Sequence, residues 1–134
     1  AGLIEILALM MELNNDDNIQ KNAPEMRYVN LAVRIISESY SEKLRISDIA
    51  DRVGINRSYL SNLFKQEMGV SPQEFLINFR LEKAAKLLKE THDTAGNIAA
   101  AVGYTDALAF SKAFKQKYGL SPRNFRNSDT GSLS

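Results

Sequence analysis

The sequence of 134 residues contains no cysteine, no tryptophan, a single histidine and three prolines. The absence of cysteine excludes a disulfide framework, a thiolate nucleophile, a cysteine-ligated zinc ion and an iron–sulfur cluster. Because His92 stands alone, a multi-histidine metal site is excluded as well, and we expect no cofactor. Neither a paired-acid constellation nor a phosphate loop of the form Gly-x-x-x-x-Gly-Lys is present. These absences argue against an enzyme.

Long apolar runs are also lacking. The longest one, residues 3–13, is interrupted by Glu5 and Glu12 and is too short to cross about 30 Å of hydrocarbon, so no membrane partner is expected. Its nine apolar residues in eleven predict a helix over 1–13 that is buried on most sides. The chain begins at Ala1 without an initiator methionine or a cationic leader, so we expect a piece of a longer protein whose missing N-terminal domain left this helix. The polar segment 14–24, closed by Pro24, is predicted to be a linker.

The positive charge is regional, although the whole chain carries only +1. Residues 1–46 hold 5 Lys/Arg and 7 Asp/Glu, whereas residues 47–127 hold 12 Lys/Arg and 8 Asp/Glu. A local basic excess suits an anionic partner. The hydrophobic fraction of 44% and the charged fraction of 25% are typical of a chain that folds.

An internal repeat is the most informative pattern in the sequence. The segment Ile49-Ala50-Asp-Arg-Val-Gly54-Ile55 recurs 49 residues later as residues 98–104, and Phe64-Lys65…Gly69…Ser71-Pro72 recurs 50 residues later as residues 114–122. In each copy a short helix, a glycine-containing turn and a second helix are predicted, which is the helix-turn-helix pattern. Two copies of one supersecondary unit are therefore expected.

The helix start and stop signals set the expected boundaries. Asn56 and Asp106 are predicted N-caps, Gly69 and Gly119 are predicted stops, and Ser71-Pro72 begins a long helix. Ser47 and Asp48 provide a cap and an acid for the first short helix, whereas Gly96 and Asn97 leave its copy plain. We predict an all-α, seven-helix, bi-lobed domain over 25–127: a scaffold helix over 25–40, helix-turn-helix units at 47–69 and 96–119, a linker helix over 71–90, a final helix over 121–127, and a disordered tail at 128–134.

These motifs resemble the AraC/XylS transcription regulators over about residues 25–126. The resemblance rests on Ile49-Ala50…Gly54…Leu63-Phe64-Lys65…Gly69-Val70-Ser71-Pro72 and on its copy, which closes with Gly119-Leu120-Ser121-Pro122…Phe125-Arg126. It implies a bacterial DNA-binding domain that follows an effector-sensing and dimerising domain, and an activator that recruits RNA polymerase. The partners it implies are double-stranded DNA, RNA polymerase, a small-molecule effector bound by the missing domain, and a second copy of the chain through that domain. It also implies a cytoplasmic, nucleoid-associated location.

The resemblance assigns candidate DNA contacts by position. The base-contacting candidates are Arg57, Ser58, Ser61 and Asn62 in the first unit and Thr105, Ser111 and Lys112 in the second. Amide, guanidinium and hydroxyl groups can all pair with base edges in the major groove. The phosphate-contacting candidates are Lys65, Lys115, Lys117, Arg123 and Arg126. Ala107 and Leu108 depart from the polar residues common in the family; either could contact a thymine methyl or simply pack.

Two further interpretations stay open from the sequence alone. A helical adaptor that binds protein would use the basic region only as a solvated surface, and Lys83, Lys86 and Lys89 are expected to form such a solvated stripe on the linker helix. Within the resemblance, the whole protein could sense a sugar, regulate stress or virulence responses, or end a phosphorelay. Sugar utilisation is favoured because it is common in the family.

Overall fold

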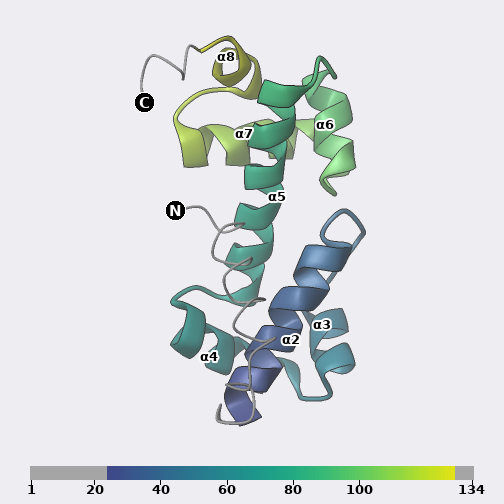
Figure 1. Ribbon diagram of the computed structural model, residues 1–134, viewed down its shortest axis with the longest axis vertical. Coiled ribbons are helices and arrows are strands. Elements are labelled where there is room, and N and C mark those ends of the chain that lie inside the picture. Colours follow the sequence, from purple (N-terminus) through teal and green to yellow (C-terminus); the bar gives the residue numbers. More distant parts are fainter. Residues whose placement is uncertain (1–23, 129–134) are drawn as a thin grey trace. The chain divides into compact units, whose positions relative to one another are not determined.

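The computed structural model describes residues 24–128, which form seven helices and no strand (Figure 1). In chain order they are α2 (Pro24–Ser39), α3 (Ile46–Val53), α4 (Arg57–Met68), α5 (Pro72–Glu90), α6 (Ala95–Ala101), α7 (Ala107–Tyr118) and α8 (Pro122–Asn127). The predicted all-α fold with two helix-turn-helix units is confirmed. The predicted helix over 1–13, nearly all of the linker over 14–24 and the tail after Ser128 lie outside the described residues.

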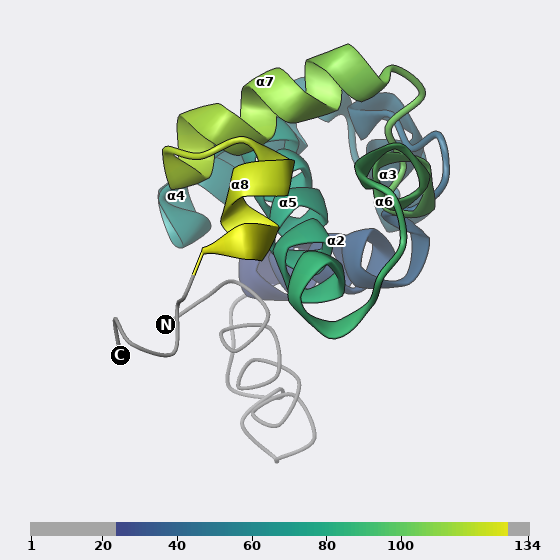
Figure 2. The ribbon, with the colours of Figure 1, turned by 90° about the horizontal axis from the view of Figure 1, so that it is seen from above.

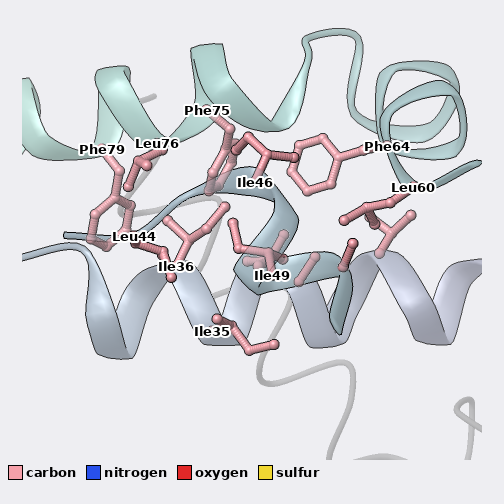
Figure 3. Packing of buried hydrophobic residues seen from close by; sticks show 14 of the residues in the cluster. Ile35, Ile36, Leu44, Ile46, Ile49, Leu60, Phe64, Phe75, Leu76 and Phe79 are labelled. Atoms are coloured by element: carbon pink, nitrogen blue, oxygen red, sulfur yellow. The ribbon is translucent and has the colours of Figure 1, made fainter. Parts of the chain in front are cut away.

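Two compact units share these helices, and the division between them falls inside α5, between Phe79 and Arg80. The first unit contains α2, α3, α4 and the start of α5. Its core is built by one face of each helix, as the apolar spacing of α2 predicts. The Phe64 and Phe75 rings meet edge to face with centroids 5.4 Å apart, and Tyr40 packs on Phe79 at 5.2 Å. Figure 3 shows this core, which includes the fully buried Ile36, Ile49, Leu60, Phe64, Phe75, Leu76 and Phe79.

The turn between α3 and α4 has the geometry that a helix-turn-helix needs. Gly54 adopts φ +91°, a left-handed conformation that a side chain disfavours, and its N–H donates to the Ala50 carbonyl at 2.8 Å. Ala50 is itself buried, so its small side chain lets the two helices approach closely. The Asn56 side chain then accepts a hydrogen bond from Tyr59 N at 2.7 Å and begins α4. The predicted turn and N-cap are both confirmed.

The second unit repeats this design around the second half of α5 (Figure 2). Gly103 adopts φ +103°, Ala99 is buried, and the Asp106 carboxylate caps α7 by accepting from Leu108 N at 2.9 Å. Its core is a chain of rings in which neighbouring centroids lie 4.6–5.7 Å apart: Tyr104, Phe110, Phe114, Tyr118 and Phe125. Aromatic pairs of this kind contribute beyond the area they bury.

The caps of the two short helices differ from the predicted ones. α3 begins after Arg45, not at Ser47, and the Asp48 carboxylate accepts from Arg45 N at 3.0 Å. The copy is not plain, because Thr94 Oγ1 accepts from Asn97 N at 3.1 Å and caps α6. Arg45 and Thr94 stand 49 residues apart, which is the offset of the repeat. The two copies therefore begin their short helices at equivalent positions with different cap chemistry.

Asp48 makes the start of α3 sensitive to acid. Its hydrogen bond from the Arg45 backbone holds the pKa of the Asp48 carboxyl below its ordinary value. A lowered folded-state pKa means that the stabilisation is present above the unfolded pKa, near 4, and is lost as the pH falls through the folded pKa. We expect Asp48→Ala to lower the melting temperature at pH 7, and the gap from the unaltered chain to shrink as the pH drops below about 4. Thermal unfolding followed by circular dichroism at both pH values measures this, and a gap that stays constant with pH would contradict it.

Among the described residues, none of the helices combines the length and the apolar character that crossing a bilayer requires.

Candidate nucleic-acid interface

The second helix of the first unit, α4, carries a polar face opposite its buried face. Leu60, Leu63 and Phe64 are buried, which turns positions 57, 58, 62 and 65 outward because residues three and four apart share a helix face. The sequence-predicted residues Arg57, Ser58, Asn62 and Lys65 are all exposed, and Ser61 is half-buried at the edge of the same face. α4 thus presents guanidinium, hydroxyl, amide and ammonium groups together.

The second helix of the other unit, α7, presents the equivalent face with a different composition. Phe110 and Phe114 are buried, so the outward positions are Ala107, Leu108, Lys112 and Lys115, each 50 residues beyond its counterpart in α4. Ser111 is half-buried like Ser61, and Thr105 is exposed just before the helix. The structure therefore brings Ser111, Lys112 and Lys115 to one face, while Thr105 lies beside the Asp106 cap.

The lysines near the end of each helix are placed alike. Gly69 N donates to the Lys65 carbonyl at 2.9 Å, and Gly119 N donates to the Lys115 carbonyl at 2.7 Å, so both lysines lie in a last turn that ends at a left-handed glycine. Both side chains are exposed, as is Arg123 in the first turn of α8. These three cations are available to a polyanion.

Two of the predicted phosphate contacts are engaged within the second unit instead. The Lys117 ammonium lies 3.8 Å from the Glu82 carboxylate and 5.6 Å from the Tyr118 ring centroid. Arg126 Nε donates to the Leu88 carbonyl at 2.9 Å, and its Nη2 atom is buried without a hydrogen-bond partner. The Leu88 hydrogen bond and this burial place the Arg126 guanidinium in the packing of α8 on α5. We therefore leave both residues out of the phosphate-contacting set.

Lys89 is exposed, as the predicted solvated stripe requires, but its ammonium also has partners within the second unit. Its ammonium donates to the Ser128 carbonyl at 2.8 Å and lies 4.9 Å from the Phe125 ring centroid. This places a cation at the C-terminal end of α8, where the helix dipole favours positive charge. Lys89 and Arg126 together fasten α8 to the end of α5.

Partial burial in the second unit shifts the pKa of one tyrosine and of one arginine. Burial, and then the nearby Glu82 carboxylate, raise the pKa of Tyr118 to about 12. Burial also lowers the pKa of Arg80, whose guanidinium lies 5.9 Å from the Tyr104 ring centroid. Tyr118 accordingly stays neutral at physiological pH, and the charge at α7 comes from its exposed lysines.

The structure adds exposed residues that sequence reasoning had not selected. Gln66 and Gln116 are exposed at the border of the two outward faces, and a glutamine amide can pair with adenine. The repeat itself could have found them, because they are 50 residues apart. Tyr59 is also exposed, although its ring meets Tyr28 of α2 with centroids 6.4 Å apart.

Known proteins share both the sequence pattern and the fold. The family model described as "Helix-turn-helix domain" matches residues 49–128. The Msm operon regulatory protein of Streptococcus mutans is 34% identical over 125 residues, which are 92% of this chain and 45% of that protein. The raffinose operon transcriptional regulatory protein of Pediococcus pentosaceus is 42% identical over 99 residues, or 74% of this chain and 36% of that protein. This chain thus spans less than half the length of either relative.

A solved structure has the same fold and a similar sequence. The transcriptional regulator from Chromobacterium violaceum, described as having an AraC-type DNA-binding domain, aligns with a TM-score of 0.72 and 31% identity, covering 79% of this chain and 95% of that one. The matching proteins are DNA-binding transcription regulators and not enzymes. The matched segment contains both outward helix faces described above. The chain belongs to the AraC-type helix-turn-helix family of bacterial transcription regulators, and its described residues form the DNA-binding domain of that family.

Proposed function

We propose that α4 and α7 each enter the major groove of double-stranded DNA and that one chain contacts two adjacent grooves. The observation that carries the proposal is the matched pair of outward faces, at positions 57, 58, 62 and 65 and again 50 residues later. The second helix of a helix-turn-helix is the one that meets base edges in the major groove. A repeat of that helix within a single chain supports two such contacts.

The length of α5 suits this arrangement. Its 19 residues extend about 28 Å at 1.5 Å per residue. The same face of a duplex presents the major groove again after about 34 Å. A continuous helix of this length is therefore a suitable spacer between two groove-binding units.

The proposed contacts fall into two classes. In α4, Arg57, Ser58, Ser61 and Asn62 contact base edges, and in the second unit Thr105, Ser111 and Lys112 do so. Lys65, Lys115 and Arg123 neutralise phosphates, which fixes the position of the domain without specifying sequence. Since α4 offers more polar groups on its outward face, we propose that the first unit contributes more of the sequence specificity.

For the whole protein we propose a transcription activator of sugar utilisation, supported by the raffinose operon relative. Its further partners are RNA polymerase, a small-molecule effector bound outside the DNA-binding domain, and a second copy of the chain joined through that other part. Such a regulator works in the cytoplasm, associated with the nucleoid.

Binding of this chain to duplexes in solution tests the proposal. Fluorescence anisotropy of a random duplex of about 20 base pairs should show affinity that falls steeply between about 50 and 200 mM salt, because phosphate contacts release counterions. Selection from a random pool should then enrich two short elements about one helical turn apart. Flat, weak binding together with no enriched sequence would contradict the proposal and favour a helical adaptor.

The salt dependence also distinguishes the individual lysines. We expect Lys115→Ala to weaken binding to selected and random duplexes alike and to lower the slope of log K against log salt by about one. Lys117→Ala removes the same charge two residues further along α7, but the Lys117 ammonium lies 3.8 Å from the Glu82 carboxylate, so the slope should change less. Anisotropy titrations at four salt concentrations measure both slopes. A Lys115→Ala slope equal to that of the unaltered chain would mean that Lys115 has no phosphate partner.

A further inference from the structure

The first turn of α7 carries an apolar surface at a position where α4 is polar. Leu108 is 62% exposed, and its neighbours Ala107 and Ala109 are exposed as well. Its counterpart 50 residues earlier is Ser58, which lies on the outward face of α4. Leu31, Tyr59 and Leu120, the other large apolar side chains exposed in the described part of the chain, are 39–42% exposed, and none of them lies on the outward face of either helix.

A single exposed leucine is common on protein surfaces and needs no explanation by itself. Leu108 differs because of its surroundings. Lys112 and Lys115 follow it on the same outward face, which draws that face toward a polyanion. Ala107 and Ala109 have short side chains, so Leu108 is the one long side chain that residues 107–109 expose.

The backbone N–H of Leu108 already has a hydrogen-bond partner. Asp106 Oδ1 accepts from Leu108 N at 2.9 Å, so this N–H is not free for a phosphate oxygen, and the carboxylate repels one. Phosphate binding at the start of α7 is therefore disfavoured. The exposed side chains of residues 107–109 therefore offer only apolar contact.

In the major groove, apolar contact has one partner among the base edges. Thymine alone carries a C5-methyl group there, and alanine or leucine side chains can pack against it. We infer that Leu108 is a specificity-determining residue that packs against a thymine methyl in the groove entered by α7. The inference rests on the proposed function, since it assigns a base preference to the second helix of the same interface.

Replacing thymine with deoxyuridine tests this directly, because the exchange removes the methyl and keeps every hydrogen-bonding group. Removing one buried methyl should weaken binding of the unaltered chain to its selected duplex about fourfold. Only thymines in the element bound by the second unit should respond. The Leu108→Ala variant should bind the thymine duplex more weakly and should no longer distinguish thymine from deoxyuridine.

Leu120→Ala provides the matched control, because it truncates an exposed leucine beyond the end of α7. This variant should keep the full response to deoxyuridine. A Leu108→Ala variant that retains the response, or an unaltered chain that shows none, would overturn the inference while leaving the proposed function intact. Either of these two results would leave the exposed Leu108 side chain as a surface for a protein partner. If selection enriches no sequence at all, the proposed function fails first, and the inference falls with it.

Discussion

Asn62→Ala is expected to weaken binding to the selected duplex by about 1–3 kcal/mol, roughly 5- to 150-fold, with little change on random DNA. The Asn62 side chain is exposed on the outward face of α4, and an asparagine amide can donate to and accept from adenine at once. It carries no charge, so its loss leaves the phosphate contacts that dominate non-specific binding unchanged.

Anisotropy with the selected and random duplexes at one fixed salt concentration measures the difference. Asn127→Ala is the matched control, since it removes an exposed amide at the last residue of α8 and should leave both affinities unaltered. Lys112→Ala alters the position equivalent to Asn62 in α7 and should weaken both duplexes, because it removes a charge. Equal losses on both duplexes for Asn62→Ala would remove Asn62 from the base-contacting set.

The helix boundaries could be predicted wherever the signal is local. The Asn56 and Asp106 side chains each accept a hydrogen bond from a backbone N–H that is two or three residues further along the chain. Gly69 and Gly119 adopt left-handed conformations immediately after the helices that they end. The predicted start of α3, with Ser47 as its cap, was wrong because the residue that precedes the helix, Arg45, is not a typical cap residue. There the cap works in reverse, with the Asp48 side chain accepting from the Arg45 backbone.

The partners of individual cationic side chains could not be predicted from local sequence signals. Lys89, Lys117 and Arg126 have partners 35 to 39 residues away in sequence, and those contacts exist only once α7 and α8 pack on α5. Charge counting places all three in one basic region, yet tertiary packing gives each of them a partner within the second unit, although Lys89 and Lys117 stay exposed. Lys65 and Lys115 are exposed on the outward faces of α4 and α7, where the repeat places both.

The two outward faces differ in chemistry although the scaffold beneath them is the same. α4 exposes Arg57, Ser58 and Asn62, whereas α7 exposes Ala107, Leu108 and Lys112 at the same positions. Buried positions of both helices carry apolar residues, with Phe64 and Phe114 equivalent and Leu60 matched by Phe110. Packing constrains the interior of both copies, while the exposed positions are free to specify different base pairs.

Phe114→Ala is expected to destabilise the second unit by about 3–5 kcal/mol. The Phe114 ring is fully buried, and its centroid lies 5.7 Å from that of Phe110, 4.6 Å from Tyr118 and 5.2 Å from Phe125. A loss of this size is comparable with the whole stability of a small domain. The aromatic core of the second unit is therefore expected to open, taking the α7 face with it.

Amide hydrogen exchange, read helix by helix, shows whether the damage stays local. Phe114→Ala should strip protection from α6, α7 and α8 and leave α2, α3 and α4 protected, because their core around Phe64 and Phe75 is untouched. Phe64→Ala, the equivalent change 50 residues earlier, should give the opposite pattern. Loss of protection in all helices for both variants would show that α5 couples the two units into one cooperative fold. If each variant instead loses one unit, the first unit should retain duplex binding without α7, and its remaining salt slope would count the phosphates that α4 and its neighbours contact.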